Sequence, residues 1–355
     1  MNRSINFSAG PAALPLAVLE RVQDELLDYR GLGHSIMETS HRSPEFMELA
    51  DRSKRNLRAI YGLNDDFEVL FLQGGATLQF AMIPMNFPDG GRPAGYVDTG
   101  VWASKAISEA RCIREVDVLA SGASACSDIV SWGNCEGRPY VHITANETVN
   151  GVQFPELPSM GDTPVCADIS SEFLTRPLDV NSASLAYAGA QKNAGPAGVT
   201  IVIVHREVID AMSGELPSML SYRRHARAGS MLNTPATFSW YVAGLVFEWV
   251  LAEGGVAEME RRTEVKSRLL YHVLDQSDLY LTTLPSECRS RVNVPFWLGS
   301  ETMDQKFLEA AEGRGLRNLK GHQRVGGIRA SLYNAVSESD VRQLVEFMQD
   351  FERTA

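Results

Sequence analysis

Lys192 and Asp168 are the two residues whose types and surroundings point most directly to chemistry. Lys192 lies in the segment Tyr-Ala-Gly-Ala-Gln-Lys-Asn-Ala-Gly-Pro-Ala-Gly (187–198), where small neighbours leave room for its side chain. Asp168 ends an apolar segment, Pro-Val-Cys-Ala-Asp (164–168). In pyridoxal phosphate (PLP) chemistry a lysine forms an imine with the cofactor aldehyde, and an aspartate keeps the pyridine nitrogen protonated. The pair suggests a PLP site. Taken alone, however, the two residues are also explained as a loop lysine and a strand-end aspartate without a shared function.

A glycine-rich segment, Leu-Gln-Gly-Gly-Ala-Thr-Leu-Gln-Phe (72–80), follows a predicted strand and opens a predicted helix. Its glycines allow a sharp turn that exposes backbone N–H groups at the positive end of a helix, a common way of binding phosphate. Gly74 and Gly75 lack the G-x-G-x-x-G spacing of dinucleotide folds, which disfavours a nicotinamide-dependent oxidoreductase. The segment indicates either the phosphate of a smaller cofactor or a tight turn without a ligand.

Two further side chains follow predicted strands. Trp102 begins a predicted helix, where its indole is able to stack on an aromatic ring, although tryptophan is more often a core residue. Thr148 follows another strand and supplies a hydroxyl group. Ligands collect at the carboxyl ends of strands in open α/β sheets, and these residues, the glycine segment, Asp168 and Lys192 all fall there. The coincidence favours the PLP interpretation.

The elements that must position these residues alternate between short apolar segments and amphipathic helices from about residue 15 to 255. This alternation is typical of an α/β fold with a largely parallel sheet. Strands are predicted at 68–72, 95–98, 113–118, 140–144, 164–169, 185–188 and 199–204, the last apolar enough to be buried on both faces. Helices are predicted at 16–29, 44–61, 77–86, 101–110 and about 236–252, the last ending near Gly254 and Gly255.

The remainder of the chain predicts a second, smaller α+β domain. A charged segment from residue 257 begins a helix, and the elements that follow are a strand near 291–295, a helix near 303–312, a strand near 327–332 and a final helix to 351. The length of 355 residues agrees with roughly two domains. We therefore predict a large PLP-binding domain at 16–255 and a small domain made of 1–15 and 256–355.

The composition bounds the classes of function. With 44% apolar and 22% charged residues it is that of an ordinary globular protein, and the absence of a signal-like or membrane-length apolar run leads us to expect a cytoplasmic one. The five cysteines form no Cys-x-x-Cys pair, which argues against disulfides and a zinc site. The net charge of -11 disfavours nucleic acid and anionic membranes, so an anionic ligand needs a local basic cluster.

Several motifs extend these observations along nearly the whole chain. They are Asn-Phe-Ser-Ala-Gly-Pro (6–11), Ser-His-Arg-Ser (40–43), Gln-Gly-Gly-Ala-Thr-Leu-Gln-Phe (73–80), Ala-Asn-Glu-Thr (145–148), Ala-Asp-Ile-Ser-Ser (167–171), Gly-Ala-Gln-Lys-Asn (189–193), Asn-Thr-Pro (233–235), Leu-Lys-Gly-His (319–322) and Gly-Gly-Ile-Arg-Ala-Ser-Leu-Tyr-Asn (326–334). In combination they are highly specific, and the chain resembles the phosphoserine aminotransferases, which are fold-type I PLP enzymes.

The resemblance implies a role for each residue of the cofactor site. Lys192 forms the imine, Asp168 pairs with the pyridine nitrogen, Trp102 stacks on the ring, and Thr148 hydrogen-bonds the phenolic oxygen. The residues implied at the cofactor phosphate are Ala76, Thr77 and Gln191, with Asn233 and Thr234 from a neighbouring subunit. The resemblance therefore implies a homodimer with shared sites.

The resemblance also implies the substrates. It places Arg329 on the substrate α-carboxylate, for which a planar guanidinium is well matched, and His41, Arg42 and His322 on the distal anion. The implied reaction transfers the amino group between L-glutamate and 3-phosphohydroxypyruvate, giving O-phospho-L-serine and 2-oxoglutarate in serine biosynthesis. The phosphorylated four-carbon oxo acid of pyridoxine biosynthesis is a further implied substrate.

The chain departs from the family at Gln323, because members usually have arginine directly after the histidine of Leu-Lys-Gly-His, whereas here Arg324 comes one place later. If this segment is a strand, successive side chains point to opposite faces, so Arg324 does not replace the missing guanidinium and phosphate binding is weakened or rearranged. The alternatives are an alanine-glyoxylate- or serine-pyruvate-type aminotransferase, a cysteine desulfurase, although no cysteine stands out in a small-residue loop, and a non-catalytic protein that retains the fold.

Overall fold

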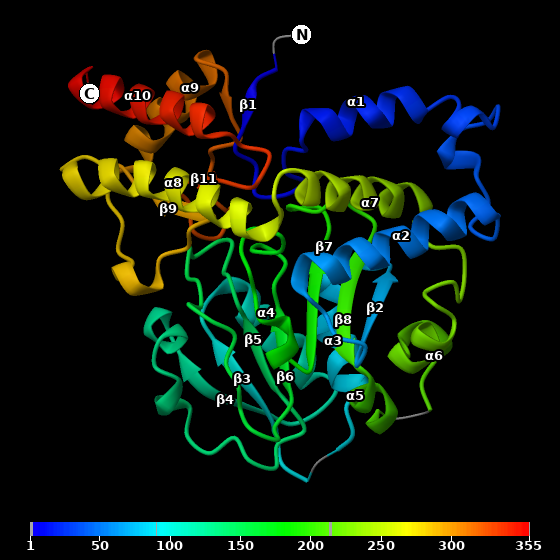
Figure 1. Cartoon of the computed structure of the whole chain (residues 1–355). Helices are drawn as coiled ribbons and strands as arrows, with labels where there is room; N and C mark the ends of the chain where they lie inside the picture. Colours follow the sequence, from blue (N-terminus) through cyan, green and yellow to red (C-terminus); the bar gives the residue numbers. More distant parts are fainter. Residues whose placement is uncertain (1–2, 90, 213–214, 355) are drawn as a thin grey trace.

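A seven-stranded sheet forms the centre of the molecule (Figure 1). In this computed structural model, which describes residues 3–89, 91–212 and 215–354, the strand order is β2-β8-β7-β6-β5-β3-β4. The strands are β2 (Phe67–Leu72), β3 (Ala94–Asp98), β4 (Val116–Ser121), β5 (Val141–Thr144), β6 (Val165–Asp168), β7 (Leu185–Gly189) and β8 (Thr200–His205). Each corresponds to a strand predicted from the sequence, so the α/β fold is confirmed.

The direction of the strands brings most of their carboxyl ends to one edge. β3 pairs in parallel with β4 and β5, and β6 is parallel to both β5 and β7. β8 is antiparallel to β2 and to β7, so these two neighbours of β8 run in the same direction. The loops that follow all strands except β8 therefore start from the same edge of the sheet.

Helices pack on both faces of the sheet. They are α1 (Leu16–Glu25), α2 (Pro44–Tyr61), α3 (Gly75–Asn86), α4 (Val101–Arg111), α5 (Arg206–Ala211), α6 (Tyr222–Arg227) and α7 (Thr237–Ala252). Ile201 and Ile203 of β8 join the core that contains α2 and α7, whereas Val202 and Val204 join the core that contains α3 and α4. Because Thr200 through Val204 are buried, the prediction of a strand covered on both faces is confirmed.

Local signals set the ends of α2, and these ends matter for the site. The Ser43 side chain accepts the N–H of Phe46 at 3.3 Å, and Pro44 occupies the first helical position, where its missing N–H costs nothing. The helix ends at Gly62, whose φ of 59° is easily adopted by glycine. His41 and Arg42 therefore lie in the turn immediately before the helix.

The carboxyl-terminal part of the chain builds a smaller α+β unit with its own hydrophobic core, which also includes Phe7. Its helices are α8 (Gly255–Gln276), α9 (Glu301–Gly313) and α10 (Glu338–Thr354), and its strand pairs are the antiparallel β9 (Asn293–Phe296) with β11 (Ile328–Ser331) and the parallel β1 (Ile5–Asn6) with β10 (Leu316–Arg317). Figure 1 shows this unit beyond the upper end of the sheet. The domain boundaries 1–15, 16–255 and 256–355 stay a prediction, and residues 1, 2 and 355 lie outside the described residues.

Short 3₁₀ helices connect several elements. They are η1 (Tyr29–Gly31), η2 (Ile36–Glu38), η3 (Ala123–Cys126), η4 (Ile129–Trp132), η5 (Val180–Ser182), η6 (Ser218–Leu220) and η7 (Ser286–Cys288). Among the described residues, no helix combines the length and the apolar character needed to cross a membrane.

Two local predictions are wrong. α1 ends at Glu25 and not at residue 29, because the chain bends before η1. β4 begins three residues late, since the N–H groups of Ile113 and Arg114 bond to the Ala110 carbonyl and close the end of α4.

The segment after His322 is a turn, whereas the argument about Arg324 assumed a strand. The N–H groups of Val325 and Gly326 both donate to the His322 carbonyl, at 2.9 and 2.8 Å. The argument from alternating strand faces therefore does not apply to Arg324, whose side chain is exposed.

Candidate active site

The residues singled out for PLP chemistry lie at the edge of the sheet where the carboxyl ends meet. The glycine segment follows β2, Trp102 follows β3, Thr148 follows β5, Asp168 ends β6 and Lys192 follows β7. The sequence thus places side chains from five different loops or strand ends along one edge, which is where ligands of open α/β sheets bind.

The Lys192 amine contacts groups from two other loops. Its Nζ donates a hydrogen bond to Thr148 Oγ1 at 2.6 Å and lies 5.6 Å from the centroid of the Trp102 ring. Burial lowers the pKa of Lys192 to about 8, against the opposing effect of the Asp168 and Glu147 carboxylates. The loss of water therefore favours the neutral amine, which is the form that acts as a nucleophile or a base.

Asp168 is a buried carboxylate with a defined orientation. Its Oδ1 accepts the backbone N–H of Ser170 at 2.9 Å. Burial raises the pKa of Asp168, whereas Lys192, Ser170 and the Tyr187 hydroxyl oppose this rise. Tyr187 is the neighbour of Asp168 in the β6–β7 register, and its hydroxyl also forms a 2.8 Å hydrogen bond with the His142 ring. A carboxylate held here is well placed to bind a cationic group, because such a partner lowers the cost of its burial.

The turn before α3 has the geometry of a phosphate cradle. Gly74 and Gly75 have φ angles of 95° and 70°, and a Cβ on Gly74 would lie 2.4 Å from a methyl carbon of Leu78. The turn therefore requires glycine. It leads into the first turn of α3, which contains Ala76 and the exposed Thr77, and the unsatisfied N–H groups of a helix start attract anions.

Three other residues implied at the cofactor phosphate lie outside this helix start. They are Gln191, Asn233 and Thr234. The backbone carbonyl of Gln191, directly before Lys192, accepts the N–H of Ala12 at 2.9 Å. Asn233 and Thr234 are exposed, and the Thr234 carbonyl accepts a 2.7 Å hydrogen bond from the side chain of Gln73, at the beginning of the glycine turn.

Glu147 is a site residue that sequence reasoning missed. It is fully buried, and its carboxylate accepts the N–H groups of Ala103 at 2.7 Å and Trp102 at 3.1 Å, thereby capping α4. Burial raises the pKa of Glu147 to about 7, although the two backbone hydrogen bonds oppose this rise. The contact fixes Trp102 in front of Lys192. The sequence did contain a signal for Glu147, because it is a charged residue shortly after an apolar strand.

Arg329 connects the smaller unit to this site. It lies on β11, and its Nη1 donates to the Thr148 carbonyl at 3.4 Å. His322 Nδ1 accepts the backbone N–H of Arg324 at 3.2 Å. Burial, and then the charges of Arg329 and Arg324, lower the pKa of its imidazole. The three basic residues lie within one short segment of a chain of net charge -11.

His41 and Arg42 are not brought to this site within one chain. Their side chains contact each other, with Arg42 Nε donating to His41 Nε2 at 3.4 Å. In Figure 1 the turn between η2 and α2 that contains them lies at the opposite side of the molecule from β11. One chain therefore holds Lys192 and Arg329 together without these two residues.

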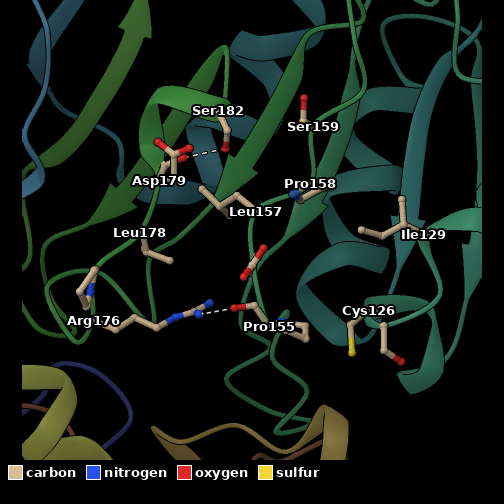
Figure 2. Close-up of a pocket in the computed structure, with 13 residues that line it drawn as sticks. Cys126, Ile129, Pro155, Leu157, Pro158, Ser159, Arg176, Leu178, Asp179 and Ser182 are labelled. Atoms are coloured by element: carbon tan, nitrogen blue, oxygen red, sulfur yellow. Dashed lines mark hydrogen bonds between the residues drawn. The ribbon is translucent and has the colours of Figure 1, made fainter. Parts of the chain in front are cut away.

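A separate cavity of about 720 Å³ lies between the segments around η3, residues 155–159 and residues 176–182 (Figure 2). None of the predicted site residues lines it. Arg176 in its wall is already paired with Glu172 at 2.9 Å and donates to the Pro155 carbonyl. The cavity is therefore less suited to binding an anion than the region around Lys192.

The fold and these residues define an aminotransferase, and comparison with known proteins agrees. The family model described as Aminotransferase class-V matches residues 4–344, and the chain belongs to this family. It is 49% identical to a phosphoserine aminotransferase of Pseudomonas aeruginosa over 99% of this chain and 98% of that protein.

Two solved structures extend the comparison. A phosphoserine aminotransferase from Bacillus circulans subsp. alkalophilus superposes with a TM-score of 0.95 at 43% identity, covering 99% of each chain. A PLP-bound phosphoserine aminotransferase from Trichomonas vaginalis gives a TM-score of 0.92 at 34% identity, covering 98% of this chain and all of that one. The family resemblance drawn from the sequence motifs is confirmed.

Proposed function

We propose that this chain is a PLP-dependent phosphoserine aminotransferase. It transfers the amino group between L-glutamate and 3-phosphohydroxypyruvate, giving O-phospho-L-serine and 2-oxoglutarate in serine biosynthesis. The observation that carries the proposal is the contact of Lys192 with Thr148, whose carbonyl accepts a hydrogen bond from Arg329. This contact lies in a chain that is 49% identical to a phosphoserine aminotransferase over nearly its full length.

The residues present fit each part of PLP. The start of α3 suits the phosphate, Asp168 the ring nitrogen, Thr148 the phenolic oxygen, Trp102 the ring face and Lys192 the aldehyde. When bound, PLP supplies an electron-accepting ring that makes the α-carbon of an attached amino acid acidic.

Two buried polar atoms also favour a ligand at this place. Trp102 Nε1 and Arg329 Nε have no hydrogen-bond partner within residues 3–89, 91–212 and 215–354. Unsatisfied buried donors are rare and costly, and a bound anionic cofactor or substrate is a partner that the protein itself does not supply.

Lys192 provides the base of the reaction. Its Nζ takes the proton from the substrate α-carbon and later returns a proton, and a pKa of about 8 leaves part of the amine neutral near pH 7. In the cofactor-free protein, the 2.6 Å hydrogen bond to Thr148 orients Nζ. Asp168 stabilises positive charge at the ring nitrogen, which increases the acidity of the substrate carbon.

Arg329 and His322 would hold the two ends of the substrate. The guanidinium of Arg329 binds the α-carboxylate, because its fork of N–H donors matches two carboxylate oxygens. His322 and Arg324 face the distal anion, which is a phosphate in one substrate and a carboxylate in the other. Because residues 323–325 form a turn, we propose that Arg324 serves the phosphate in the absence of an arginine at position 323.

We propose a homodimer in which His41, Arg42, Asn233 and Thr234 complete the site of the partner. The separation of the His41 turn from β11 within one chain supports this arrangement.

Mixing Lys192→Ala and Arg42→Ala subunits under conditions that allow subunit exchange tests the shared site. A shared site predicts that activity returns, because one site of each mixed dimer then carries neither substitution. Recovery no greater than the sum of the separate variants would exclude a site shared through Arg42.

A half-reaction titration tests the proposed substrates. Phosphoserine, glutamate, alanine and serine are added separately to the PLP-loaded protein, and the cofactor absorbance is recorded. Phosphoserine and glutamate should each convert the cofactor to its aminated form. Conversion by alanine or serine but not by phosphoserine would instead indicate an alanine-glyoxylate- or serine-pyruvate-type enzyme. The reverse assay, which starts from the aminated cofactor and follows its return to the PLP form, tests the phosphorylated four-carbon oxo acid of pyridoxine biosynthesis. The cytoplasmic location stays a prediction.

A further inference from the structure

Lys266 is a buried lysine whose ammonium group is surrounded by main-chain carbonyls. It lies on α8 with 1% of its surface exposed. Its Nζ donates hydrogen bonds of 2.9 Å to each of the carbonyls of Leu332, Tyr333 and Val336. An ammonium group has three N–H donors, so the three acceptors satisfy all of them. A buried lysine is costly to maintain, and its three partners are all in one short segment.

The segment 332–336 directly follows β11, the strand that carries Arg329. Leu332 is the first residue beyond Ser331, and its N–H donates to the Val292 carbonyl at 2.7 Å. By holding three carbonyls of this segment, Lys266 fixes the end of the strand from which Arg329 projects. We call residues 332–336 the post-β11 turn.

The post-β11 turn also contacts the loop of Lys192. The N–H of Asn334 donates to Asn193 Oδ1 at 3.0 Å, and Asn193 is the residue next to Lys192. The hydroxyl of Tyr333 donates to the Ala9 carbonyl at 3.0 Å, and a Cβ on the following residue, Gly10, would lie 3.5 Å from Lys192 Cγ. The turn thus touches two segments that pack around the lysine.

A third contact reaches the segment that follows Asp168. The side-chain amide of Asn334 donates to the Leu174 carbonyl at 2.7 Å, and that of Asn193 donates to the Phe173 carbonyl at 2.7 Å. Leu174 is fully buried and has a φ of 65°, a conformation that costs energy for a residue with a branched side chain. Its N–H is held by the Tyr61 hydroxyl at 2.7 Å. Such strain persists only where several contacts hold the backbone, and Asn334 supplies one of them.

We propose that Lys266 and Asn334 are positioning residues that fix the distance between Arg329 and Lys192. This inference rests on the proposed function, in which Arg329 binds the α-carboxylate and Lys192 acts at the adjacent α-carbon. Lys266 holds the post-β11 turn on the side of the smaller unit, and Asn334 joins the same turn to Asn193 and Leu174 beside the cofactor site. Every substrate of the enzyme carries the α-carboxylate, so the effect on binding is common to all of them.

Lys266→Met tests the proposal because methionine keeps the length and apolar stem of lysine but leaves the three carbonyls without a donor. The matched control is Ser267→Ala, which removes a buried hydroxyl from the next residue of α8, where it bonds to the Glu264 carbonyl. We expect Lys266→Met to raise KM for glutamate and for phosphoserine together, by about tenfold, since small misplacements far from the reacting atoms have effects of this size or larger. The control should leave both KM values unchanged.

Amide hydrogen exchange of the full-length protein without substrate gives a second readout that does not depend on the reaction. The Asn334 amide, which is protected by Asn193, should exchange about tenfold faster in Lys266→Met than in Ser267→Ala, because local opening of the turn becomes easier. A loss of thermal stability with unchanged Asn334 protection and unchanged KM values would overturn the proposal and leave Lys266 as a purely structural residue.

Asn334→Ala keeps the proposal testable if Lys266→Met does not fold. It removes the bond to Leu174 while the Lys266 contacts remain, so both KM values should rise together, by a smaller factor than in Lys266→Met. An Asn334→Ala enzyme with wild-type KM values would contradict the proposal. If neither phosphoserine nor glutamate reacts in the unmodified protein, the proposed function fails, whereas the exchange of the Asn334 amide still reports on the coupling of the turn.

Discussion

The cofactor end and the substrate end of the site are built differently. Lys192, Asp168 and Thr148 are held at strand ends or in tight loops, contact one another or their close neighbours, and belong to one chain. His41, Arg42 and Arg324 lie in turns, and the side chains of the two arginines are exposed. The residues proposed for the covalent chemistry are therefore preorganised by the sheet, whereas those proposed for the distal anion lie in surface turns.

From this difference we expect the two ends to tolerate substitution differently. A group held by strands and burial has a single position and a shifted pKa, so its replacement removes a function that nothing nearby provides. An exposed guanidinium is weakly held and screened by water. Moving an arginine from position 323 to position 324 should therefore change anion binding only slightly. Substitutions at the buried end should therefore reduce activity more than substitutions at the exposed end.

Replacement of Lys192 should have the largest effect. Lys192→Ala should lower kcat by about 1,000-fold or more, because it removes both the covalent anchor and the general base. Lys105→Ala is the matched control, since the Lys105 amine lies 5.5 Å from the same Trp102 ring. Borohydride reduction followed by peptide mapping should find a pyridoxyl group on Lys192 only. A label on Lys105 instead would reverse the assignment.

Asp168→Ala should come next and should act on turnover more than on cofactor retention. Without the carboxylate the ring nitrogen loses its charged partner, and the loss of one preorganised charge lowers rates by roughly 100-fold or more. Steady-state kcat and the dissociation constant of PLP, measured by fluorescence, separate the two effects. Near-normal turnover would show that Asp168 does not serve the ring nitrogen.

Arg329→Ala should affect both amino-acid substrates equally, because both carry an α-carboxylate. Loss of a partly buried charge pair of about 2 kcal/mol corresponds to a rise of roughly 30-fold in KM for glutamate and for phosphoserine. Arg317→Ala on β10 is the control in the same unit, where the arginine pairs with Glu312 at the surface. A rise confined to phosphoserine would move Arg329 to the distal anion.

The pKa of about 8 for Lys192 makes covalent capture of PLP by the cofactor-free protein depend on pH. The capture rate should rise several-fold between about pH 7 and pH 8 and then level off, because the neutral amine saturates above its pKa. An unshifted lysine would show a continued rise towards pH 10.5.

The same shift predicts the sign of a stability effect. The folded pKa lies below the ordinary value of 10.5, so the unfolded chain binds more protons between about pH 8 and 10.5. The stability of the cofactor-free protein, relative to Lys192→Met, should therefore increase with pH across this interval. Urea unfolding of both proteins at several pH values measures it, and a flat difference would argue against the shift.

The smallest effect is expected at the exposed end. Arg324→Ala should raise KM for phosphoserine by about two- to fivefold and leave that for glutamate nearly unchanged, as exposed ion pairs contribute about 1 kcal/mol or less. Gln323→Arg, which introduces the arginine common in the family, should change KM for phosphoserine in the opposite direction. Equal effects of Arg324→Ala on both substrates would show that Arg324 does not distinguish the phosphate.

The sequence predicted which residues meet at the edge of the sheet better than it predicted the segment around Arg324. Apolar runs locate buried strands, and the residues that follow them, such as Lys192 and Thr148, are brought to one edge by the topology of the sheet. The argument about Arg324 assumed a strand, whereas the segment is a turn closed by local hydrogen bonds to the His322 carbonyl, which composition does not reveal.

Other features depend on contacts between residues far apart in the chain. Glu147 caps the helix that starts at residue 101, and Arg329 reaches the carbonyl of Thr148 from 181 positions away. No local pattern encodes such pairs. The distance between His41 and β11 likewise follows from the complete fold and was not available from the motif that contains His41.

The reversed strand β8 has a consequence for the size of the ligand. Leu72, at the end of β2, and Gly189, at the end of β7, both lie opposite Thr200 of β8. The glycine turn and the lysine loop therefore start two strand spacings apart, or about 10 Å. In the proposed site, β8 therefore separates the turn assigned to the phosphate from the amine assigned to the aldehyde, and this separation would set the length of the cofactor that the two loops hold.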